Sequence, residues 1–209
     1  MLASVTLLSV LLFSCDRNKS DKNDMPQYTS PTAQAMDLSE VDISRYVELG
    51  EYRGMVITLV SSEDKRSDAV WKRVVDNATV MEYPEQQVEY YLAQSRAKYE
   101  YIAKSRNDTY ENVISLLGVT EEDMLNEARA LVREDLVFYA LLKAESVTLS
   151  EEEKNNNFDR YVNKFVVDYG YTEAYARERM QSQIYDAMLF DKMLEKLMLI
   201  NEFVVSQGE

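Results

Sequence analysis

The chain has 209 residues and carries 37 acidic against 23 basic side chains, a formal net charge of -14. This charge argues against a nucleic-acid partner, because phosphates are bound by Lys and Arg, and against a purely electrostatic hold on an anionic membrane. Histidine is absent and cysteine occurs once, which excludes a Ser-His-Asp triad, an internal disulfide and a cysteine-based zinc site. We expect no catalytic residue, no metal and no cofactor, although a calcium site built from carboxylates alone stays open.

Residues 1–14 are almost wholly apolar. They are too few for a transmembrane helix, which needs about 20 apolar residues, and their length suits the hydrophobic region of a signal peptide. The run Leu12-Phe13-Ser14-Cys15 resembles a bacterial lipobox, which implies cleavage before Cys15 and lipid attachment to it. We therefore expect a protein anchored by lipid at the extracytoplasmic face of a cell membrane. The alternative is an ordinary cysteine after a secretory signal.

Residues 15–40 are rich in Asp, Asn, Ser and Lys, and they show no hydrophobic period. A segment of this composition cannot bury enough apolar surface to fold. The pattern therefore predicts a disordered tether between the anchor and one folded domain over 41–209. A loop of the folded domain is the alternative for this segment.

The folded domain begins with the single strand that the sequence predicts. Gly50 and Gly54 mark turns, and the apolar and β-branched residues from Met55 to Val60 are typical of a short strand. A polar connector over 61–70 follows. The next residues, 71–80, predict a short helix with an extended end.

Two helices of unequal length are expected after this point. Pro84 suits the first turn of a helix, where its missing N–H costs nothing, and apolar residues at helical spacing continue this helix to about residue 106. A shorter helix begins at Thr109. It ends at Gly118, because helices commonly close on a glycine with positive φ.

Capping patterns predict the start of the next two helices. Thr120 with Asp123 three residues later begins a helix over 121–145 that contains no glycine or proline. Ser150 with Glu153 is a capping box and begins another helix. Gly170 closes that helix, and a long final helix is expected over 172–203.

The stretch LLGVTEEDMLNEARALVREDLVFYALLKAESVTLSEEE carries a specific order of signals: an LG-x-T-E-E turn, a long amphipathic helix, and a V-T-x-S-x-E-E turn. This stretch resembles the C-terminal, substrate-binding domain of trigger-factor chaperones. The segment YVELGEYRGMVITL is similar to the part of that family that leads into the same domain. The resemblance covers roughly residues 41–203. It implies a mainly α fold of long bent helices, like the trigger-factor C-terminal (SurA-like) domain, with one short β element near 55–60.

Two parts of the family are missing from this chain. The residues between the predicted strand and the helix at 71–80 leave no room for the FKBP-type prolyl isomerase domain, and the basic ribosome-docking domain is absent. Both absences argue against ribosome binding and against isomerase activity of the kind that the full family shows.

The resemblance implies an ATP-independent chaperone that binds unfolded or nascent secreted polypeptides. The 15 tyrosines and 10 methionines of the chain support this interpretation, because both residue types suit adaptable apolar surfaces. We expect the bound segments to contact side chains on the three long helices: Tyr91, Tyr99, Met124, Phe138, Met180, Ile184 and Met188. Two alternatives stay open: a residual peptidyl-prolyl isomerase of the trigger-factor type, and an adaptor lipoprotein with one dedicated partner.

Overall fold

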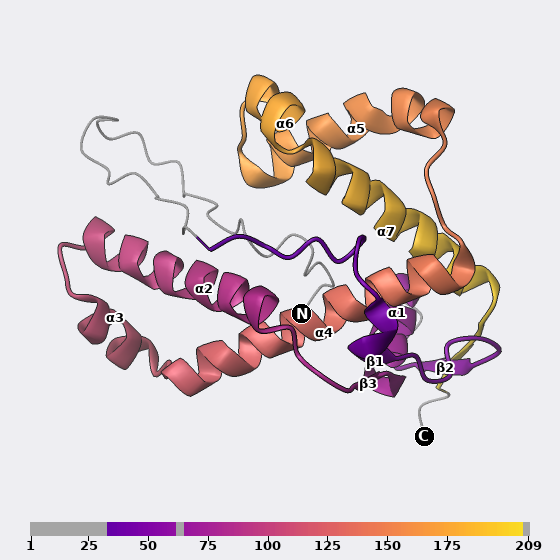
Figure 1. Ribbon diagram of the computed structural model, residues 1–209, viewed down its shortest axis with the longest axis horizontal. Coiled ribbons are helices and arrows are strands. Elements are labelled where there is room, and N and C mark those ends of the chain that lie inside the picture. Colours follow the sequence, from indigo (N-terminus) through magenta and orange to yellow (C-terminus); the bar gives the residue numbers. More distant parts are fainter. Residues whose placement is uncertain (1–32, 62–64, 207–209) are drawn as a thin grey trace.

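The computed structural model describes residues 33–61 and 65–206. These residues form a mainly helical molecule with a few short strands, which confirms the predicted class. Figure 1 shows two helical arms that extend from a shared body. The predicted signal peptide and Cys15 lie outside the described residues, as do residues 16–32 of the predicted tether.

The body contains all the strands of the described chain. The 3₁₀ turn η2 (Ile43–Arg45) leads into β1 (Val47–Glu48), which pairs antiparallel with β3 (Thr79–Val80). Helix α1 (Arg66–Asn77) lies between β2 (Val56–Leu59) and β3 in the chain. Strand β2 pairs in parallel with β4 (Glu202–Val205), the last element of the chain.

The sequence predicts β2 but not the other three strands. Strands β1 and β3 have two residues each, too short for a readable alternation of apolar and polar side chains. Strand β4 begins at Glu202, within the final helix predicted over 172–203, and ends two residues beyond it. It forms because Val56 lies opposite Glu202 and Leu59 opposite Val205, a pairing between distant parts of the chain that no local pattern reveals.

The first arm is an antiparallel pair of long helices joined by a short one at the tip. Helix α2 (Glu85–Ser105) runs out from the body, α3 (Tyr110–Leu117) turns at the tip, and α4 (Glu121–Glu145) returns to the body (Figure 1). Gly118 has a φ of 65° and closes α3 as predicted. Thr120 and Asp123 bond reciprocally as a capping box at the start of α4.

The second arm consists of α5 (Glu151–Tyr169), α6 (Glu173–Arg179) and the first part of α7 (Gln181–Leu199). The predicted capping box at Ser150 and the end at Gly170 are both present. The prediction of one continuous final helix is wrong. The chain breaks at Met180, whose φ of -112° and ψ of 16° are not helical, and this break lets α6 pack on α5 while α7 runs back to the body.

Two separate clusters of buried side chains stabilise the molecule. The larger cluster combines the body with the first arm, and Trp71, Phe138 and Phe190 meet at its centre with ring centroids 4.9 and 5.7 Å apart. The smaller cluster lies within the second arm and includes Phe165 and Ile184. Each arm therefore has its own apolar support.

A buried carboxylate joins the two returning helices in the body. Glu145, at the end of α4, has a fully buried side chain that forms ion pairs with Lys196 Nζ on α7 at 2.7 Å and with Arg53. Lys196 also donates to the main-chain oxygen of Glu145 at 2.9 Å. The two cations lower the pKa of Glu145 although burial opposes them, and this cluster fixes α7 against the end of α4.

Candidate functional site

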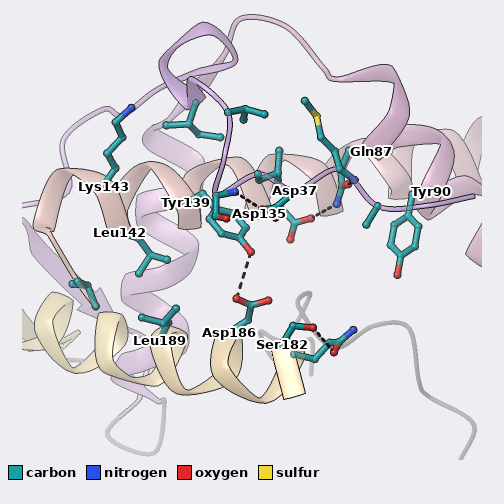
Figure 2. Close-up of a pocket in the computed structure, with 18 of the residues that line it drawn as sticks. Asp37, Gln87, Tyr90, Asp135, Tyr139, Leu142, Lys143, Ser182, Asp186 and Leu189 are labelled. Atoms are coloured by element: carbon teal, nitrogen blue, oxygen red, sulfur yellow. Dashed lines mark hydrogen bonds between the residues drawn. The ribbon is translucent and has the colours of Figure 1, made fainter. Parts of the chain in front are cut away.

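The arms enclose a cleft of about 860 Å³, a volume within the usual range of ligand pockets. Its lining comes from α2, α4, the start of α7 and residues 35–39. Figure 2 shows Leu142 of α4 and Leu189 of α7 on opposite sides of this space. The cleft therefore lies between the arms, and residues 35–39 form part of its lining.

The end of the predicted tether belongs to the folded part. Leu38 is 3% exposed and is part of the larger core, and the main-chain N–H of Met36 donates to Gln87 Oε1 of α2 at 2.9 Å. The expectation of a tether reaching to residue 40 is therefore wrong for its last residues. The composition of this segment gave no sign of docking, because one leucine and one methionine among polar residues make no period.

A buried acid lies on the α4 side of the cleft. The side chain of Asp135 is almost fully buried. Its Oδ2 atom accepts from Tyr91 OH at 2.6 Å. The same atom accepts from Gln87 Nε2 at 2.9 Å (Figure 2). Burial raises the pKa of Asp135 to about 7, although both hydrogen bonds lower it. The carboxyl group therefore changes protonation near neutral pH.

A second acidic side chain of the cleft, that of Asp186, comes from α7. Asp186 Oδ1 accepts from Tyr139 OH of α4 at 3.4 Å (Figure 2). Burial, together with the smaller effect of the Asp37 carboxylate, raises the pKa of Asp186 to about 6, although the hydrogen bond from Tyr139 lowers it. Among the described residues of the lining Lys143 is the single cation, and it pairs with Asp42 at 3.8 Å, so the described interior of the cleft is acidic.

This arrangement suits binding better than catalysis. Asp135 is held by two donors and is nearly sealed from the cleft, so it is poorly placed to take a proton from a substrate. Within 33–61 and 65–206, no group of three or more acidic, cysteine or histidine side chains is arranged to hold a metal ion. The cleft offers apolar surface, tyrosine hydroxyls and carboxylates, which are groups that hold a polypeptide segment.

All seven predicted contact residues are buried. The larger core contains Tyr91, Tyr99, Met124 and Phe138, and the smaller one contains Met180, Ile184 and Met188. None of them exposes more than 9% of its surface, and only Tyr91 and Met180 reach the lining of the cleft. Helical periodicity selected these residues, and the most apolar face of a helix is the one that packs against its neighbour.

The exposed apolar residues gather elsewhere, first at the arm tips. Leu116 and Leu117 of α3 are 74% and 49% exposed, and Val167 of α5 and Tyr175 of α6 are 80% and 46% exposed. Tyr175 stacks on Tyr171 with ring centroids 5.0 Å apart. A second group lies on the two-stranded sheet of the body: Val56, Val60, Val204 and Val205.

Sequence reasoning missed these residues, because no local signal distinguishes them from buried ones. The adjacent residues Leu136, Val137 and Phe138 of α4 are all buried, whereas the adjacent Leu116 and Leu117 of α3 are exposed. Val167 and Tyr175 likewise carry no mark that separates them from their buried neighbours.

The described helices include none with the length and hydrophobicity that would let it cross a bilayer. Comparisons of the chain with models of protein families, with curated proteins and with solved structures found no match.

Proposed function

We propose that this protein is an ATP-independent chaperone that holds non-native polypeptide segments between its two arms. The observation that carries this proposal is the cleft of about 860 Å³, which lies between the arms and is lined by apolar, tyrosine and acidic side chains. Exposed leucine, valine and tyrosine at both arm tips extend the apolar surface beyond the cleft. Large exposed apolar groups typically mark surfaces that contact other polypeptides.

The order of the elements supports a relationship to trigger factor as part of this proposal. Helices α2 to α5 and their caps occur in the order that the family's C-terminal domain implies. The connection between β2 and α1 is only six residues long, which is far too short for an isomerase domain. We therefore propose a chaperone of the trigger-factor type that works without prolyl isomerase activity.

The proposed site of action is the extracytoplasmic face of a cell membrane, with acylated Cys15 as the anchor. Unfolded or nascent secreted polypeptides would be the clients. The net charge of -14 keeps a protein with exposed apolar tips soluble.

An aggregation assay tests the chaperone activity. The full chain with Cys15→Ser, which removes the acylation site, should suppress the aggregation of a reduced, unfolding client protein without ATP. Replacing Leu142 and Leu189 by serine should weaken client binding at least about tenfold, because burying a leucine contributes about 1.5–3 kcal/mol.

The matched control is Leu199→Ser, which changes a leucine that also lies on α7 but is 86% exposed and outside the cleft lining. This variant should bind clients like the parent chain. Two results would contradict the proposal: an equal loss of client binding in the control and in the cleft variant, or a parent chain that does not suppress client aggregation. An adaptor role would instead appear as one stoichiometric partner in a pull-down, and isomerase activity as faster proline-limited refolding.

A further inference from the structure

Residues 34–38 belong to no helix or strand and lie along the cleft. We call this segment the strap. The side chain of Leu38 is 3% exposed and enters the larger core, and Met36 packs against the same core. The strap is therefore an extended peptide that places apolar side chains into a groove between the arms.

Side chains of α2 hold the main chain of the strap. Gln87 Oε1 accepts from the main-chain N–H of Met36 at 2.9 Å, and Gln86 Nε2 donates to the main-chain oxygen of Gln34 at 3.3 Å. Gln87 is itself fixed by its bond to Asp135. Contacts to the main chain do not depend on the sequence of the bound peptide, so this wall of the cleft fits any extended segment with a suitably placed aliphatic side chain.

The strap also brings an acidic side chain to the cleft. Asp37 lines the cleft together with Asp186. Burial is the main cause that raises the pKa of Asp186, and the charge of Asp37 adds to it. Lys143, the one cation that the described part of the chain contributes to the lining, pairs with Asp42 outside the strap. A segment with a neutral or basic side chain in the position of Asp37 would avoid this repulsion.

We infer that the groove occupied by the strap, made by Gln86, Gln87 and the pocket of Leu38, is a binding site for extended apolar peptides in which a client segment replaces the strap. This inference rests on the proposed function, because it assigns the clients a binding mode in the cleft. The favoured occupant has an aliphatic residue in the place of Leu38 and no acidic residue just before it.

The first experiment measures peptide binding in trans. A fluorescein-labelled peptide of the strap sequence, AQAMDLSE, is titrated with the full chain carrying Cys15→Ser, and fluorescence anisotropy is recorded. Adding Leu38→Ser should free the groove, so the peptide should bind this variant at least about tenfold more tightly than the parent. A peptide with lysine in the place of Asp37 should bind more tightly still.

The matched control is Leu116→Ser, which removes a leucine at the tip of the first arm and leaves the strap intact. It should behave like the parent chain. Because Leu38 contributes to the core, circular dichroism checks that each variant is folded. Met36→Ser, which alters a half-buried strap residue, provides a second way to loosen the strap with less loss of core.

The second experiment uses an unfolded client in place of the peptide. Tighter client binding by Leu38→Ser and Met36→Ser than by the parent supports the inference. Equal or weaker client binding by both variants, together with no peptide binding, overturns it and leaves the chaperone proposal standing. Peptide binding with no client binding by any variant would instead retain the groove and reject the chaperone proposal.

Discussion

The two arms look alike in Figure 1 but are stabilised differently. The first arm shares one continuous core with the body, because α4 runs from the arm tip into the body, where Phe138 meets Phe190 of α7. The second arm has a small core of its own, and it connects to the body through α7 and the turn after α4. A cleft between a fixed arm and an independently packed arm can change its width without disturbing the main core.

Loss of a large core side chain from each arm is the strongest test of this difference. Phe138→Ala should lower the global free energy of unfolding by about 3–5 kcal/mol. Phe165→Ala, at an equally buried site of the second arm, should open that arm while the body stays folded. Hydrogen exchange measures both effects, and faster exchange throughout the body in Phe165→Ala would contradict the independence of the second arm.

The next largest effect concerns Asp135, which lies on the fixed side of the cleft. Its pKa is about 7 in the folded protein, against 3.8 for a free side chain. The folded state therefore holds a proton that the unfolded state releases, so stability falls as pH rises between about 4 and 7. Each pKa unit corresponds to about 1.4 kcal/mol of unfolding free energy, so the loss of stability is at most a few kcal/mol.

Asp135→Asn removes this titration while keeping an acceptor oxygen for Tyr91 and Gln87. Urea unfolding at pH 5 and pH 8 should show a smaller loss of stability with pH than in the parent chain. An unchanged pH dependence would mean that Asp135 ionises with the pKa of a free side chain. Water would then reach its carboxyl group more easily than its 4% exposed fraction indicates.

The two capping boxes offer a milder comparison. Thr120→Ala and Ser150→Ala each remove a side chain that bonds the main-chain N–H three residues later, and each should cost about 1 kcal/mol. The cost in Thr120→Ala should appear in the global unfolding transition. In Ser150→Ala it should appear mainly as faster exchange in α5, and the reverse pattern would show that the arms have been assigned the wrong roles.

The smallest expected effect lies at the connection between the arms. Ser146 follows α4 with a φ of 50°, a conformation that glycine adopts more easily than serine. Ser146→Gly should raise stability by about 0.5–1 kcal/mol if the strain dominates, measured by thermal unfolding. A loss of stability would indicate that the added freedom of glycine in the unfolded chain is the larger effect.

The helices of both arms were predictable because their signals are local. Thr120, Ser150, Gly118 and Gly170 act within a few residues of their own position, so their roles are visible in the sequence. The break at Met180 was not predictable in this way. No glycine, proline or capping residue marks it, and it forms where α6 turns to pack against α5.

The cleft was much less accessible to sequence reasoning. Apolar spacing identified residues such as Phe138 and Ile184 that support the arms, and these are buried. The polar residues in the wall of the cleft include Asp135, Gln87 and Asp186, which have no distinguishing neighbours in the sequence. Their importance comes from burial, which depends on how separate helices pack.

The sequence alone therefore determined the mainly helical class, the positions of most helix ends and the strand at 56–59, because each depends on residues close together in the chain. Tertiary structure decided the pairing of β2 with β4, the docking of Leu38 and the raised pKa values in the cleft. Each of these joins residues that lie far apart in the sequence. Contacts of that kind follow from the shape of the packed helices, which no local pattern encodes.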